Sequence, residues 1–198
     1  MVSSGRLHPL YAAVLTAALA VTGVSDGYGQ STDPSPRGSS NSQAEGAATP
    51  SDFITNAILA NLAAARSECG SYDRIYRVDC LRHRLLDISR RIPEGPAYGQ
   101  ARQIVGRAAS RLGSIQSANA DTRVPKQRSR RNPRLREAKV YTAIKREKLN
   151  QAMQQASRVI EEAATQLLRA GENSEKRSAH YQKIAAAVGS TKVLLRSA

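Results

Sequence analysis

Apolar residues recur every three or four positions in several separate stretches, the pattern of helices that bury one face. The first stretch predicts a helix that begins with Thr49 as N-cap and ends at Gly70, just after Cys69. The second predicts a helix with a coiled-coil-like seam, and Pro93 ends it. The apolar positions of that seam are Val78, Leu81, Leu85, Ile88 and Ile92.

Further along the chain, a third stretch predicts a helix over residues 97–118, and the last stretch predicts a helix from Ser174. Between them, the pair Asn132-Pro133 predicts the start of the longest helix, which ends at Gly171 and would be about 55 Å long. Its first half is poorly amphipathic, so we expect that half to project beyond the body of the protein. No stretch alternates as a strand does, so the predicted class is all-α, a small bundle of about five helices with one long helix.

The amino terminus has the features of an export signal. Arg6 supplies positive charge, an apolar run follows over residues 10–24, and polar residues come next. The run is shorter than the roughly 20 residues that cross a bilayer, so we expect a signal peptide over residues 1–25 rather than an uncleaved anchor. Cleavage is expected after Ala20 or after Ser25.

The next segment, residues 26–48, is mostly Ser, Gly, Pro, Asp, Asn, Gln and Ala. Such a composition buries too little apolar area to offset the entropy of ordering, so a disordered linker is expected there. The helical domain then covers residues 49–198, in a protein expected in the periplasm or outside the cell. Aromatic residues make up only 4% of the chain, so the core must be built from Leu, Ile, Val and Ala.

Cys69 and Cys80 are the only cysteines, and export towards an oxidising compartment favours a disulfide between them. Bridged cysteines need Cα atoms within about 7 Å of each other. We therefore expect residues 70–76 to form a loop, with the second helix beginning near Arg77. The alternative is a zinc site, since His83 lies one helical turn after Cys80 and Cys69 could add a third ligand.

Around the cysteines the sequence reads Glu-Cys-Gly-Ser-Tyr at 68–72 and Tyr-Arg-Val-Asp-Cys-Leu at 76–81. Over residues 65–90 the chain resembles exported helical proteins of bacteria that carry a two-cysteine helical hairpin and have no assigned activity. The resemblance implies a location in the envelope or outside the cell. It implies no catalytic or binding residues.

Positive charge is concentrated in one part of the chain. The net charge is +14, and residues 101–150 hold 14 Lys and Arg against 3 Asp and Glu. Guanidinium groups beside exposed N–H groups at a helix start favour phosphate or carboxylate ligands. The candidate anion-binding residues are those around the start of the predicted long helix: Arg123, Lys126, Arg128, Arg130, Arg131, Arg134 and Arg136. The alternative is a solvated basic loop that aids solubility.

The sequence contains no recognisable catalytic motif, and neither His83 nor His180 has a nucleophile near it along the chain. We therefore expect a non-enzymatic protein without a cofactor. It would bind an anionic envelope component, a lipid phosphate or an acidic polysaccharide, or else an acidic protein. Nucleic acid is disfavoured because the basic segment lacks interleaved aromatic residues. The alternative function is structural, with self-association through the 78–92 seam and a second one between Leu149 and Leu167.

Overall fold

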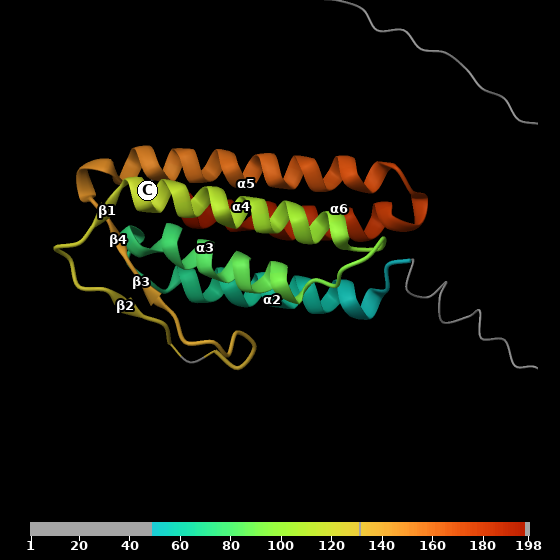
Figure 1. Ribbon diagram of the computed structural model, residues 1–198, viewed down its shortest axis with the longest axis horizontal. Helices are drawn as coiled ribbons and strands as arrows, with labels where there is room; N and C mark the ends of the chain where they lie inside the picture. The colour runs from blue at the N-terminus through green and yellow to red at the C-terminus, as the bar shows by residue number, and fades with distance from the viewer. Residues whose placement is uncertain (1–48, 131, 197–198) are drawn as a thin grey trace, which may run out of the picture. The chain divides into compact units, whose positions relative to one another are not determined.

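The computed structural model describes residues 49–130 and 132–196. The predicted signal peptide and linker, residues 1–48, lie outside the described residues, as does Arg131. The described part is a bundle of helices, which confirms the predicted all-α class (Figure 1). Its helices are α2 (Asp52–Gly70), α3 (Arg74–Arg91), α4 (Gly99–Ala118), α5 (Leu149–Glu172) and α6 (Glu175–Ser190), with 3₁₀ turns η1 (Arg146–Lys148) and η2 (Thr191–Leu195).

The five α-helices run side by side, and each packs against the next (Figure 1). Since α6 also packs against α2, the helices close into a ring around one core. Both predicted seams lie inside it. The apolar side chains of the first seam are at most 1% exposed, and those of α5 that face the core are at most 4% exposed. The apolar side chains of both seams therefore pack within the chain.

The start of α2 differs from the prediction by two residues. Ser51, not Thr49, is the N-cap, and its hydroxyl accepts a hydrogen bond from the backbone N–H of Ile54. Tyr98 fixes this cap from the other side, because its hydroxyl accepts from the N–H of Ser51 at 2.9 Å and donates to its carbonyl at 2.8 Å. A tertiary contact with a tyrosine 47 residues away thus selects the capping residue.

The start of α3 was also predicted wrongly, as the helix begins at Arg74 rather than near Arg77. Asp73 is its N-cap and accepts from the N–H of Ile75 at 3.1 Å. Cys69 and Cys80 nevertheless form the predicted disulfide, with a Cα–Cα distance of 5.6 Å. The early start is compatible with the disulfide because α3 rises about 9 Å between Arg74 and Cys80. The first turns of α3 therefore lie beyond the end of α2, and Cys80 lies opposite Cys69.

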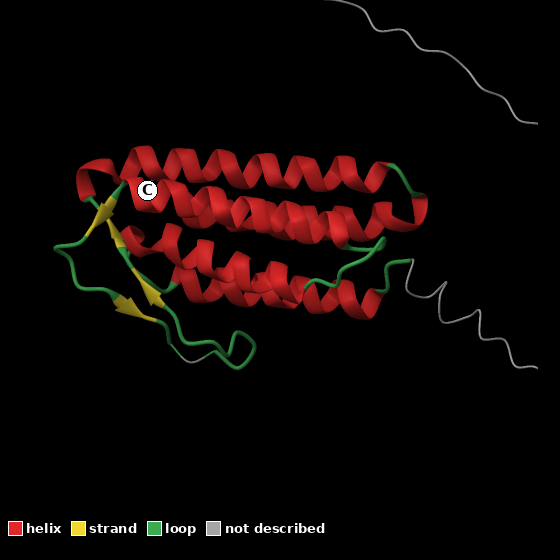
Figure 2. Cartoon of the chain, in the orientation of Figure 1, coloured by secondary structure: helices red, strands yellow, loops and turns green. Residues whose placement is uncertain are grey.

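The prediction of a long helix from Asn132 is wrong over the first half of that helix. α5 begins only at Leu149, so it is about 36 Å long rather than 55 Å, and no helical half projects from the body. Residues 119–148, called the connector below, instead form two small antiparallel sheets where no strand was expected (Figure 2). β1 (Ala120–Asp121) pairs with β4 (Ala143–Ile144), and β2 (Gln127–Arg128) pairs with β3 (Val140–Tyr141).

The predictions for the two remaining helices hold. α4 ends at Ala118 as expected and begins two residues later than predicted, and α6 begins at Glu175, one residue after the predicted start at Ser174. Across residues 49–130 and 132–196, no helix combines the length and the apolar character needed to cross a lipid bilayer.

Candidate anion-binding site

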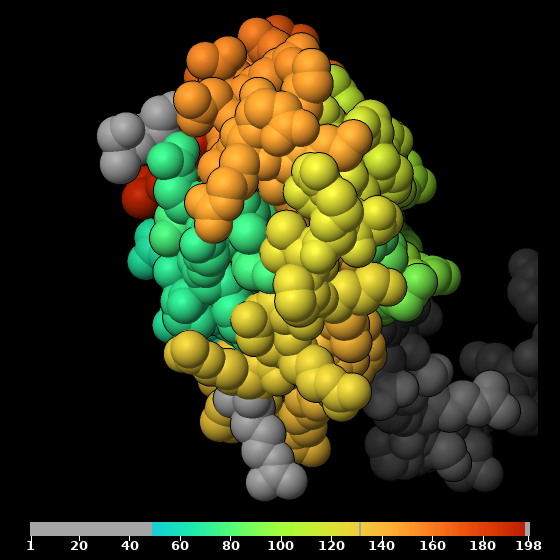
Figure 3. Space-filling view, turned by 90° about the vertical axis from the view of Figure 1, so that its left-hand side faces the viewer, coloured from blue at the N-terminus to red at the C-terminus, as the bar shows by residue number. Residues whose placement is uncertain are grey.

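The connector carries the predicted basic residues and folds back on itself at one end of the bundle. Figure 3 looks onto this end, where the connector, in yellow and orange, lies beside the end of α2 and the start of α3. Its outgoing strands pair with its returning strands, Ala120 opposite Ile144 and Gln127 opposite Tyr141. Tyr141, Ala143 and Ile144 are buried, which ties the returning strands to the core.

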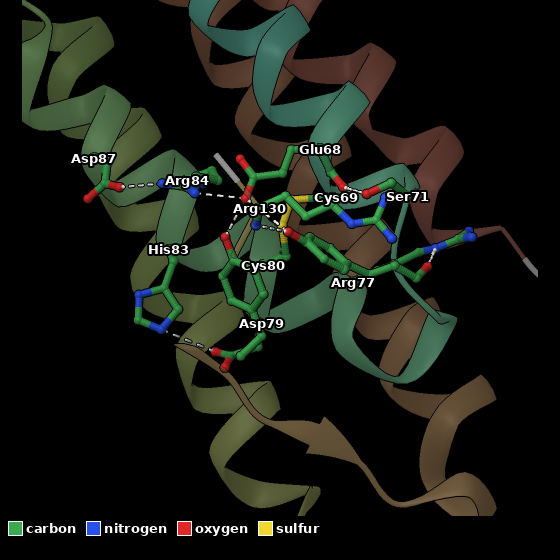
Figure 4. Close-up of a disulfide and its surroundings, with 12 residues drawn as sticks. Glu68, Cys69, Ser71, Arg77, Asp79, Cys80, His83, Arg84, Asp87 and Arg130 are labelled. Carbon is green, nitrogen blue, oxygen red and sulfur yellow. Dashed lines mark hydrogen bonds and ion pairs between the residues drawn. A yellow bond between two sulfur atoms is a disulfide. The ribbon is translucent and has the colours of Figure 1, made fainter. Parts of the chain in front are cut away.

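A buried cluster of charged residues lies next to the disulfide, beneath the connector (Figure 4). Arg84 has no exposed side-chain surface, and its Nη2 lies 2.7 Å from Oε1 of Glu68. Its Nη1 lies 3.4 Å from Oδ2 of Asp87 and donates to the carbonyl of Glu137 in the connector at 3.0 Å. Tyr141 donates from its hydroxyl to Glu68 at 2.8 Å. The connector is thus fixed to α2 and α3 through buried polar contacts.

Two further contacts dock the connector on α3. Lys139 lies 2.8 Å from Oδ1 of Asp87, and the N–H of Thr142 donates to Oδ2 of Asp79 at 2.7 Å. Both carboxylates belong to α3, so these contacts hold the returning part of the connector against that helix.

The electrostatics of this cluster follow from burial and close pairing. Burial, followed by the hydrogen bond to Glu68, raises the pKa of Tyr141 far above its usual range. Burial alone would lower the pKa of Lys139, but its hydrogen bonds with Asp87 and Glu137 raise it. The same Lys139 lowers the pKa of Glu137. These groups therefore keep their usual protonation states at neutral pH, with Lys139 charged and Tyr141 neutral.

His83 lies at the edge of the cluster. Burial and then the charge of Arg82 lower its pKa, although Asp79 acts in the opposite direction. Arg82 lies 2.7 Å from Nε2 of the ring, where it can donate to the neutral form.

The turn after Asn132 explains why the sequence resembled a helix start. The side-chain oxygen of Asn132 accepts hydrogen bonds from the N–H groups of Arg134 and Leu135, at 3.0 and 3.1 Å, as an N-cap does. The chain then leaves the helical path. Leu135 is buried in the core, and Arg91 donates to the carbonyl of Arg134 at 3.0 Å.

This turn and the two helices beside it surround an open cleft of about 520 Å³. Three arginines line it, Arg91 from α3 and Arg134 and Arg136 from the turn, together with Asn61 of α2 and Pro133. All three arginines are exposed, and none forms an ion pair with an acidic residue in the part of the chain that the structure describes. The nearby acid Glu137 is already engaged by Lys139, at 2.6 Å. The cleft is called the arginine cleft below.

Arg131 lies outside the described residues, and the other four predicted basic residues do not line the arginine cleft. Arg123 forms a close pair with Asp121, with nitrogen–oxygen distances of 3.1 and 3.2 Å, and this pairing lowers the pKa of Asp121. Lys126 and Arg128 are exposed elsewhere on the connector, and Arg130 lies with its guanidinium 5.9 Å from the ring centre of Tyr72. Among the described residues, the predicted set is therefore divided between the arginine cleft and other parts of the connector, and none of these residues lies at the start of an α-helix.

Sequence reasoning missed Arg91, because it lies in the last turn of α3, outside the basic segment of residues 101–150. Its hydrogen bond to Arg134 joins residues 43 apart, which helical spacing cannot reveal. The signal in the sequence was the Arg90-Arg91 doublet in the last turn of α3, where cations suit the helix dipole.

The structure also places the residues of a candidate zinc site and the second candidate histidine. The sulfur atoms of Cys69 and Cys80 bond to each other, so neither is a thiolate for zinc, and within residues 49–130 and 132–196 no three His, Cys, Asp or Glu side chains gather as metal ligands would. His180 accepts or donates one hydrogen bond with the hydroxyl of Thr55, at 2.8 Å. Thr55 is completely buried and also bonds Tyr98, so we assign this pair to the packing of α2 against α6.

No protein-family model, no curated protein and no solved structure matches the chain.

Proposed function

We propose that this is an exported, non-enzymatic binding protein that holds phosphate or carboxylate groups of an anionic envelope component in the arginine cleft. The observation that carries the proposal is the convergence of Arg91, Arg134 and Arg136, from two distant parts of the chain, around one open cleft. Guanidinium groups that lack carboxylate partners remain available to an external anion, and their planar donors match phosphate and carboxylate.

A location outside the cytoplasm is part of the proposal. The buried disulfide supports it, because such bonds persist in oxidising compartments. The predicted export signal over residues 1–25 agrees with it.

Charge reversal in the arginine cleft tests the proposal. The purified protein would be titrated with vesicles containing phosphatidylglycerol, with polygalacturonate and with polyglutamate, at several NaCl concentrations. We expect at least one probe to bind, with an affinity that falls as salt rises. The double variant R134E/R136E should bind that probe about tenfold more weakly or worse, since hydrogen bonds to charged groups are lost.

The matched control is R158E/K176E, which changes the net charge equally at two exposed positions outside the cleft. This control should lose much less affinity than the cleft variant. Equal losses in the two variants would mean that only the overall charge attracts anions, and binding of none of the probes would also reject the proposal.

A further inference from the structure

An apolar groove adjoins the arginine cleft. It is a cavity of about 150 Å³ between α2 and α3, and Asn61 and Arg91 line both the groove and the cleft. The other side chains that line it are all apolar: Phe53, Ile54, Ala57, Ile58, Ile88, Ile92 and Pro93. An apolar cavity therefore lies beside a cationic one, with Asn61 and Arg91 at their common border.

Phe53 makes the groove unusual for a surface feature. It is the only phenylalanine of the chain, and 84% of its side chain is exposed although the core is poor in aromatic residues. A ring this exposed gains little from burial within the described fold. From Phe53 to Asn61 the groove follows α2 for about 12 Å, which is long enough for part of an alkyl chain.

Arg91 connects the two parts. Its guanidinium reaches the turn of the connector, where it donates to the carbonyl of Arg134, while the residue also lines the groove. Long arginine side chains commonly cover apolar surface with their methylene groups and keep the charged end in a polar place.

We propose that the ligand of the arginine cleft is an anionic amphiphile with a single alkyl chain. Its phosphate or carboxylate lies among Arg91, Arg134 and Arg136, and its chain lies along the groove towards Phe53. The inference rests on the proposed function and narrows it, since acidic polysaccharides and acidic peptides have no alkyl chain to fill the groove. The small volume of the groove favours one chain of a single amphiphile over the broad surface of a bilayer.

The test compares four probes by isothermal titration calorimetry, with amphiphiles kept below their micelle concentrations. Octyl phosphate has both parts, inorganic phosphate has only the anion, and octyl glucoside has only the chain. Vesicles containing phosphatidylglycerol present anions on a bilayer. We expect octyl phosphate to bind at least about tenfold more tightly than inorganic phosphate, because several methylene groups leave water, and more tightly than octyl glucoside.

Variants locate the binding. A57E places a carboxylate in the groove at an exposed helical position, and A63E makes the same change on α2 at an exposed position outside both cavities. A57E should remove the advantage of octyl phosphate over inorganic phosphate, A63E should keep it, and R134E/R136E should weaken both phosphates. Circular dichroism would verify that each variant is folded.

The outcomes separate the two proposals. If octyl phosphate binds no better than inorganic phosphate, or if A57E and A63E behave alike, the amphiphile inference is overturned while anion binding stands. Binding to vesicles without binding to octyl phosphate would also overturn it, in favour of a bilayer surface. If neither phosphate responds to R134E/R136E, and the vesicles, polygalacturonate and polyglutamate also fail to bind, the proposed function fails as well.

Discussion

Arg84 carries a full charge and has no exposed side-chain surface, so the carboxylates beside it must stabilise this buried charge. It bonds Glu68 of α2, Asp87 of α3 and the backbone of Glu137, and therefore joins both helices to the connector. Oε2 of Glu68 and Nε of Arg84 are buried without a hydrogen-bond partner among the described residues. A cluster that is satisfied only in part adds little net stability, but breaking one half of it is costly.

The substitution R84M should lower the free energy of unfolding by about 3–5 kcal/mol, because it leaves the Glu68 carboxylate buried without its cation. Adding E68Q to R84M should restore part of that loss, since the uncompensated charge is removed. Urea denaturation of the wild type, both single variants and the double variant gives the coupling energy. Purely additive effects would show that Glu68 and Arg84 do not depend on each other.

Among the elements, the hairpin of α2 and α3 is the one closed by the disulfide. The two cysteines are 11 residues apart, and both are completely buried. In the chain-entropy account, a loop of this length contributes about 3 kcal/mol. The double variant C69S/C80S should therefore unfold at a clearly lower urea concentration.

The control for this prediction is urea denaturation of the wild type with and without a reductant. Reduced wild type and C69S/C80S should have similar midpoints, both below that of the oxidised protein. An unchanged midpoint in C69S/C80S would contradict the prediction.

The elements differ in how far the sequence predicts them, and the connector shows why. Helical periodicity located α4 and α6 closely, because their apolar faces repeat locally. Asn132 gave a correct local signal, a capped turn, but the residues after it have no apolar stripe to continue a helix. What fixes them lies far away: the hydroxyl of Tyr141 bonds Glu68, 73 residues earlier.

The sequence likewise predicted only part of the candidate site. Composition located the basic segment, and Arg134 and Arg136 do line the arginine cleft. Arg91 and the neighbouring groove come from the packing of α2, α3 and the connector, which no local pattern encodes. The long helix does not begin at Asn132, so its N-terminus supplies no backbone N–H donors to the cleft. Anion binding in the cleft would therefore depend on the guanidinium groups.

For the molecule as a whole, the net charge of +14 is itself a cost to the compact state, because like charges repel one another. Docking the connector brings several of these charges near the end of the bundle, and the carboxylates of Asp79 and Asp87 offset part of that repulsion. The arginine cleft has no such carboxylate of its own within the described residues. An anion bound there should therefore stabilise the entire fold and not only the turn that holds it.

This linkage can be measured without knowing the natural ligand. Inorganic phosphate should raise the melting temperature more than NaCl of equal ionic strength, by an amount that corresponds to about 2.7 kcal/mol once phosphate reaches 100 times its Kd. Phosphate also stabilises proteins generally, because it is excluded from their surfaces. The specific part is therefore the difference between R158E/K176E, which should respond as the wild type does, and R134E/R136E, which should keep only the general effect. If phosphate raises the melting temperatures of these two variants equally, the arginine cleft is not the site at which the anion acts.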